Sequence, residues 1–153
     1  MELTQNPSVL ELVRKTAELT TPKEIVWIDG SEAQLESLRK IAVETGELIK
    51  LNEEKLPGCY LNRSDVNDVA RVEGRTFICS RTREEAGPTN NWMDPNEMKA
   101  KLHEILRCAM AGRTMYVIPY SMGVIGSPFA KYGIELTDSI YVCLLYTSDA
   151  ADE

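Results

Sequence analysis

The chain has 153 residues, the size of one ordinary domain, and its 43% hydrophobic and 27% charged residues indicate a globular protein rather than a disordered one. It has no apolar run near the ~20 residues of a membrane helix, and its first residues lack the pattern of a secretory signal, so we expect a cytoplasmic protein with no membrane partner. The formal net charge of −7, without a basic stripe, argues against a nucleic-acid partner.

The first half of the chain predicts helix, strand, helix and strand in that order. Asn6, followed by Pro, is a typical helix start, because Asn caps free amide groups and Pro suits the first turn. The apolar run 25–28 predicts a buried strand. Ser31 with Gln34 three residues later predicts a capped second helix. With a further short strand at 48–51, this order predicts a βαβ unit whose two strands are parallel.

Two glycine-bearing turns lack the patterns that bind phosphate. The turn at 29–31 has no G-x-G-x-x-G spacing, and the loop at 121–128 lacks the lysine and Ser/Thr of a nucleotide P-loop. We therefore expect Gly123 and Gly126 to shape a loop near a cleft rather than to hold a nucleotide.

The second half of the chain predicts a loop at 52–67, a charged surface connection at 81–91 and then a third helix. Asp94, followed by Pro, is the expected cap of that helix. An apolar stripe predicts its buried face. His103 lies off the centre of the stripe, so we interpret it as a half-exposed packing residue rather than a ligand. The residues of the stripe are Met98, Leu102, Ile105, Leu106 and Ala109.

The residues after this helix predict three strands. The segment 114–119 has bulky residues on both sides, which is typical of a strand inside a sheet. The segments 134–137 and 139–142 predict two shorter strands.

The four cysteines indicate reduced thiols rather than a disulfide framework or a zinc site. They form no C-x-x-C pair, and a single histidine cannot complete a zinc site at their spacings. No export signal accompanies them, so an oxidising compartment is not expected. The cysteines are Cys59, Cys79, Cys108 and Cys143.

The segment 68–80 predicts a strand that carries Arg71 among β-branched and aromatic residues. Two interpretations of Arg71 stay open from the residues alone. It is either a solvated arginine, ion-paired with Glu73 or Asp68, or it clamps a small anion. A guanidinium is planar and permanently charged, so it can grip a carboxylate or phosphate through two parallel hydrogen bonds.

Four blocks of sequence resemble the N-terminal part of GTP-dependent phosphoenolpyruvate carboxykinase. They follow one another in the family's order, and the resemblance runs from about Leu10 to Val142. The blocks are YLNRSDVNDVARVEGRTFICS, AGPTNNWMDPNEM, GRTMYVIPYSMG and GSPFAKYGIELTDS. The resemblance implies an α/β fold, namely a truncated N-terminal carboxykinase domain with a mixed sheet and the βαβ unit.

The resemblance also implies a function for a longer parent protein. The family converts oxaloacetate and GTP to phosphoenolpyruvate, GDP and CO2, and the arginine of its DVAR block, here Arg71, binds the substrate carboxylate. The parent would use Mn2+, with Mg2+ on GTP, and act as a monomer. The nucleotide loop, metal ligands and guanine pocket belong to later parts of the family sequence, so the resemblance implies that this chain alone is inactive and has no catalytic, cofactor or metal residues.

Two alternatives to this interpretation remain at the level of sequence. One is a stand-alone domain that binds an anion or a partner and has no catalytic activity. The other is the ATP-dependent carboxykinase class, which is disfavoured because its N-terminal blocks differ from these.

The last residues, 143–153, have the sequence CLLYTSDAADE, which resembles a translated sequencing-library adapter. We therefore expect two parts: a partial N-terminal carboxykinase domain at 1–142, and a non-native, adapter-derived tail at 143–153.

Overall fold

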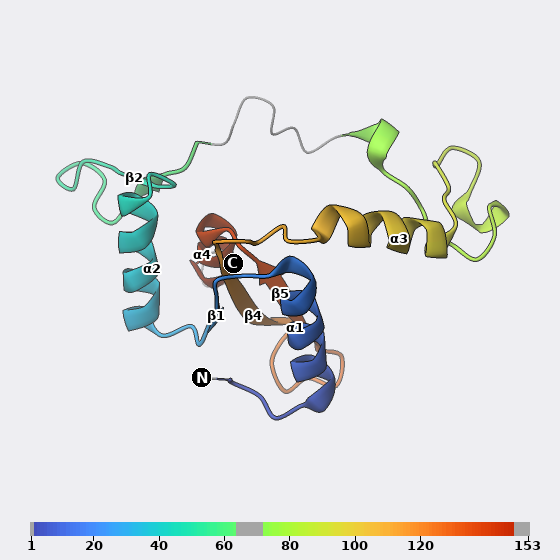
Figure 1. Cartoon of the computed structure of the whole chain (residues 1–153). Coiled ribbons are helices and arrows are strands. Elements are labelled where there is room, and N and C mark those ends of the chain that lie inside the picture. The colour runs from blue at the N-terminus through green and yellow to red at the C-terminus, as the bar shows by residue number, and fades with distance from the viewer. Residues whose placement is uncertain (1, 64–71, 149–153) are drawn as a thin grey trace.

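A mixed sheet forms the centre of the protein in the computed structural model, which describes residues 2–63 and 72–148. Within these residues the sheet has three strands, β1 (Glu24–Trp27), β4 (Thr114–Met122) and β5 (Lys131–Thr137), in the order β1-β4-β5 (Figure 1). β1 runs parallel to β4, and β5 runs antiparallel to it. The predicted mixed sheet is therefore confirmed.

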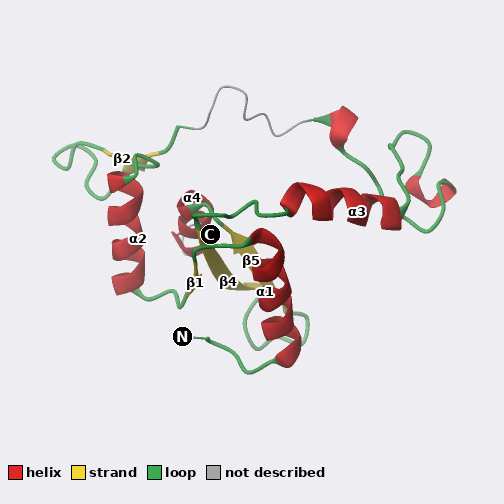
Figure 2. Cartoon of the chain, viewed as in Figure 1, coloured by secondary structure: helices red, strands yellow, loops and turns green. Residues whose placement is uncertain are grey.

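Helices cover both faces of this sheet (Figure 2). α1 (Pro7–Thr20) packs on one face, and α2 (Glu32–Glu44) and α4 (Ile140–Ser148) pack on the other. β4 is buried on both sides because it is the central strand, as the sequence predicted. The core on the α1 side contains Val13, Trp27, Met115 and Val117. The opposite core contains Ile28, Leu35, Leu38, Ala42, Leu48, Tyr116, Ile118, Ile140, Cys143 and Leu144.

The predicted helix starts are confirmed by hydrogen bonds to their capping side chains. Asn6 Oδ1 accepts a hydrogen bond from the Ser8 amide at 3.0 Å, and Ser31 Oγ accepts one from the Gln34 amide at 3.3 Å. Asp94 Oδ1 caps α3 (Pro95–Leu106) in the same way. Such caps satisfy amide groups that have no partner within the helix.

The predicted βαβ unit is wrong, because the second short strand does not join the sheet. β2 (Ile49–Lys50) instead pairs antiparallel with β3 (Tyr60–Leu61), which lies inside the predicted loop. The side-chain amide of Asn62 closes this small hairpin by donating to the Glu47 carbonyl oxygen at 2.8 Å. The place beside β1 is filled by β4, so the parallel partner of β1 comes from far along the chain.

The segment 139–142 begins a helix and not the predicted strand. Ser139 Oγ accepts a hydrogen bond from the Val142 amide at 3.3 Å near the start of α4. Cys143 and Leu144, which follow, are buried against the sheet. These contacts do not identify the origin of residues 143–153, so the division into a carboxykinase domain and an adapter-derived tail stays a prediction.

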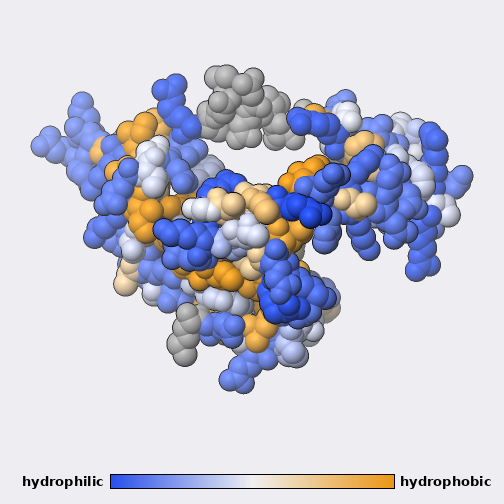
Figure 3. Space-filling view, in the orientation of Figure 1, coloured by the Kyte–Doolittle hydropathy of each residue, from blue (hydrophilic) through white to orange (hydrophobic). Residues whose placement is uncertain are grey.

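The predicted buried face of α3 is wrong. Leu102, Ile105 and Leu106 are 45%, 72% and 42% exposed, and Met98 is only half-buried. α3 extends away from the sheet (Figure 1) and contacts α1 through only a few residues, so most of its apolar stripe stays exposed. His103 is exposed rather than half-exposed. Figure 3 shows the same division, with apolar residues gathered over the middle of the molecule and hydrophilic ones over the outlying segments.

Candidate functional site

Arg71 lies outside the described residues, and the structure describes the chain again from Val72. The predicted strand at 68–80 is wrong over residues 72–80. A turn of 3-10 helix, η1 (Glu73–Arg75), follows Val72 at once, and Ile78 then forms a single bridge with Trp92. The Arg75 amide donates to the Val72 carbonyl oxygen at 3.0 Å, so this segment turns where the β-branched residues suggested an extended chain.

Asn91, which lies shortly before α3 in the sequence, is hydrogen-bonded to the segment 73–76. Its side-chain amide donates to the Glu73 carbonyl oxygen at 2.9 Å and to that of Thr76 at 3.3 Å. The indole N–H of Trp92 donates to the Ser80 carbonyl oxygen at 3.1 Å. These bonds fix the backbone at Glu73, Thr76 and Ser80. Asn91 is the last residue of the predicted surface connection at 81–91, and Trp92 follows it directly.

A separate cavity of about 750 Å³ lies at the carboxyl ends of β1 and β4. Crevices at the carboxyl ends of neighbouring parallel strands are common ligand sites in α/β folds. Two loops that are distant in sequence line it, and Gly123 is among the lining residues, as predicted, whereas Gly126 is not. The lining residues are Ile28, Asp29, Gly30, Ile118, Pro119, Tyr120, Ser121, Met122, Gly123 and Ile125.

Asp29 is the acidic group of this cavity, and its turn is held by the capping residues of α2. The Ser31 amide donates to Asp29 Oδ1 at 2.8 Å, and hydrogen bonding by Ser31 lowers the pKa of the Asp29 carboxyl. Gln34 accepts from the Asp29 amide and donates to the Trp27 carbonyl oxygen, both at 2.8 Å. Among the described residues that line this cavity there is no lysine or arginine.

The remaining described residues hold neither a metal cluster nor a membrane segment. Residues 2–63 and 72–148 include no group of three or more His, Cys, Asp or Glu side chains placed to hold a metal ion. Across the same two ranges, no helix has the length and apolar character that crossing a bilayer demands.

Comparison with known proteins decides the family. Residues 11–147 match the family model described as the phosphoenolpyruvate carboxykinase N-terminal domain. The chain belongs to this family. The match includes Arg71 and extends five residues beyond Val142 into the predicted tail. It agrees with the mixed α/β fold, and it confirms the resemblance of the four sequence blocks to this carboxykinase domain.

Curated relatives of the carboxykinase family are similar over almost the whole chain. The protein named phosphoenolpyruvate carboxykinase [GTP] from Corynebacterium kroppenstedtii is 55% identical over 141 residues, which cover 92% of this chain and 23% of the relative. Proteins of the same name from Neocallimastix frontalis and Anaeromyxobacter dehalogenans are each 53% identical, over 90% and 92% of this chain. The chain spans 22% and 24% of those two relatives, so it corresponds to less than a quarter of a carboxykinase.

Proposed function

We propose that this chain is the N-terminal part of a GTP-dependent phosphoenolpyruvate carboxykinase. The parent protein would convert oxaloacetate and GTP to phosphoenolpyruvate, GDP and CO2, and would also run the reverse reaction. The observation that carries this proposal is the family match over residues 11–147 together with 55% identity to a relative of that name. A cytoplasmic, monomeric parent is part of the same proposal.

Arg71 is the proposed substrate-binding residue of this chain. It lies in the DVAR block, inside the matched region. A guanidinium can hold the planar carboxylate of oxaloacetate or phosphoenolpyruvate through two charge-assisted hydrogen bonds. This binding would orient the substrate while other groups perform the transfer, since phosphoryl transfer depends on positioning and on charge stabilisation. The hydrogen bonds from Asn91 to the carbonyl oxygens of Glu73 and Thr76 support the proposal by fixing the backbone of the segment that follows Arg71 in the sequence.

The catalytic groups are proposed to lie in the rest of the parent protein. The parent protein would use Mn2+, with Mg2+ bound to GTP. The described residues of this chain form no cluster that fits a metal ion. The chain alone is expected to release no more CO2 from oxaloacetate with GTP than a protein-free control, and turnover above that control would show that the catalytic groups are misplaced.

The test of Arg71 uses the full-length parent, with Arg71→Met and the matched control Arg75→Met. Arg75 is exposed and lies four residues later on η1. Loss of a charge-assisted pair predicts a rise of about 10- to 100-fold in the KM for oxaloacetate, with the KM for GTP nearly unchanged. Arg75→Met should alter neither. An unchanged oxaloacetate KM in Arg71→Met would make Arg71 a structural residue.

The genomic sequence downstream of the codon for Val142 separates the parent enzyme from a stand-alone domain. A reading frame that continues with carboxykinase sequence supports both the enzyme and the adapter origin of residues 143–153. A natural stop codon directly after residue 153 would favour a stand-alone anion-binding or interaction domain.

A further inference from the structure

The loop between β4 and β5 presents large apolar side chains to solvent. Met122 is 65% exposed, Val124 and Ile125 are each 79% exposed, and Phe129 is 86% exposed. We call these four residues the hairpin-tip patch. The loop lies at the same end of the sheet as the start of α1 (Figure 1), and within the described residues no helix or strand covers it.

The composition of this loop is unlike that of a solvated surface loop. The loop residues 123–130 include no Asp, Glu, Lys, Arg or His, although 27% of all residues in the chain are charged. Exposed apolar residues that occur singly need no explanation, but a contiguous apolar group marks an interaction surface. The absence of charge argues for an apolar partner surface rather than for a charged ligand.

The loop is held by its own hydrogen bonds, so the patch does not depend on a partner for its shape. The Ser127 amide donates to the Val124 carbonyl oxygen at 3.0 Å, and the Ala130 amide donates to the Ser127 carbonyl oxygen at 3.1 Å. The Phe129 amide donates to Ser127 Oγ at 3.2 Å, and the Gly126 amide donates to the Tyr132 hydroxyl at 3.3 Å. A preformed apolar surface loses little conformational entropy on docking.

We propose that the hairpin-tip patch is the docking surface for the remainder of the parent carboxykinase. The chain corresponds to 22–24% of its curated relatives and matches an N-terminal domain, so about three quarters of the protein lies outside it. Met122 and Ile125 also line the cavity at the carboxyl ends of β1 and β4, so docking there would close that cavity. The proposal rests on the chain's being part of a longer family protein, and it does not depend on Arg71 or on catalysis.

Hydroxyl-radical footprinting of the chain and of the full-length parent tests this proposal without using activity. Side chains in the buried core of an interface are desolvated, so Phe129 and Met122 should be modified about tenfold more slowly in the parent than in the 153-residue chain. Leu56 provides an internal control, since it is 50% exposed and lies among charged residues. Equal modification of Phe129 in the two proteins would overturn the proposal. Slow modification of Phe129 in the 153-residue chain but not in the parent would also overturn the proposal, and would indicate that a second copy of the chain covers the patch.

A pair of variants tests the same surface by stability. Phe129→Asp should lower the Tm of the full-length parent by several degrees but leave the Tm of the chain unchanged, because a carboxylate is costly only where it is buried. Leu56→Asp, the matched control, should leave both Tm values unchanged. Equal effects of Phe129→Asp on the chain and on the parent would assign Phe129 to the fold of this domain and reject docking.

Discussion

The phenol ring of Tyr120 lies over the α-carbon of Gly133 on the neighbouring strand. The two residues face each other in the antiparallel register of β4 and β5. A β-carbon added to Gly133 would lie 2.4 Å from Tyr120 Cζ, so the ring occupies the space that a side chain would need. Tyr120 also lines both the cavity at the carboxyl ends of the strands and a groove beside α1, so its position shapes two surfaces.

Gly133→Ala should displace the Tyr120 ring and destabilise the fold. Overpacking of this kind costs about 1–2 kcal/mol of the free energy of unfolding, which chemical denaturation measures. Gly74→Ala is the matched control, because the space around Gly74 is open, and its effect should stay below about 0.5 kcal/mol. Equal effects at the two glycines would show that the ring moves aside freely.

Removal of the Asp94 cap should destabilise α3 alone, whereas removal of the Asn6 cap should destabilise the whole fold. Asp94→Ala removes an oxygen that accepts from the Asn96 and Glu97 amides at 2.8 and 3.3 Å. α3 has no buried residue, so the cap loss should speed hydrogen exchange within α3 while the denaturation midpoint hardly moves. Asn6→Ala should lower the global free energy of unfolding by about 1 kcal/mol, because α1 packs into the core through Val13. A shifted midpoint in Asp94→Ala would mean that α3 unfolds together with the sheet.

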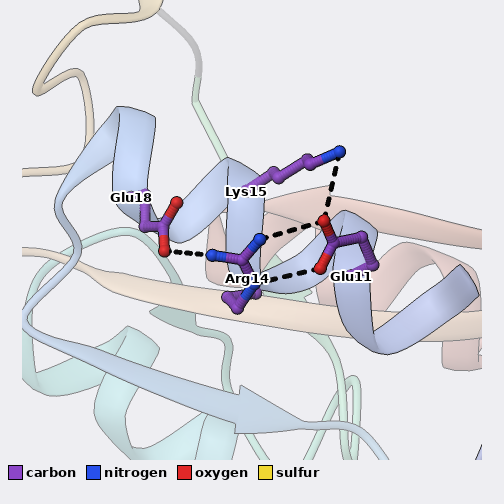
Figure 4. Close-up of polar contacts among 4 residues, drawn as sticks. All are labelled: Glu11, Arg14, Lys15 and Glu18. Atoms are coloured by element: carbon purple, nitrogen blue, oxygen red, sulfur yellow. Dashed lines mark hydrogen bonds and ion pairs between the residues drawn. The ribbon is translucent and has the colours of Figure 1, made fainter. Parts of the chain in front are cut away.

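Glu11 should titrate far below an ordinary glutamate. Its carboxylate accepts from Arg14 Nε and Nη2 at 3.0 and 2.9 Å and lies 3.1 Å from Lys15 Nζ, while Arg14 also contacts Glu18 (Figure 4). Hydrogen bonds from Arg14, and then from Lys15, lower the pKa of Glu11 from 4.5 to about 2. A carboxyl group whose pKa is lower in the folded state stabilises the fold at pH values above its unfolded-state pKa. This contribution is therefore lost as the pH falls from about 4.5 towards 2.

Carbon-13 NMR titration of the Glu11 carboxyl checks this prediction. Arg14→Met should raise the Glu11 pKa more than Lys15→Met does, since Arg14 is the larger cause. High salt should weaken both effects because the groups are exposed. An ordinary Glu11 pKa at low salt would contradict the ion network.

Cys143 should resist thiol reagents that modify the other three cysteines. Cys143 is fully buried, and burial, with a smaller effect of Glu135, raises the pKa of its thiol to about 11. The thiolate is the reactive form, so at pH 8 only the exposed Cys59, Cys79 and Cys108 should be labelled in the native chain. Peptide mapping by mass spectrometry identifies the labelled sites. Labelling of Cys143 before unfolding would show that α4 leaves the core readily.

The family and the substrate-binding hypothesis for Arg71 were accessible from sequence because they rest on ordered blocks of residues. Arg71 lies outside the described residues. In the segment that follows it in the sequence, Asn91 and Trp92 anchor the backbone at Glu73 and Ser80. That relationship joins segments that are separated in the chain, and no local pattern predicts such a bond.

Helix starts could be predicted residue by residue, because a cap and the amides that it satisfies lie within three residues of each other, as at Asn6, Ser31 and Asp94. The partner of β1 and the exposure of α3 could not. Periodicity reports that a face is apolar but not what covers it, and strand order depends on which distant segment fills the place beside β1. Only the tertiary structure, which places β4 between β1 and β5 and α3 away from the sheet, decided those two features.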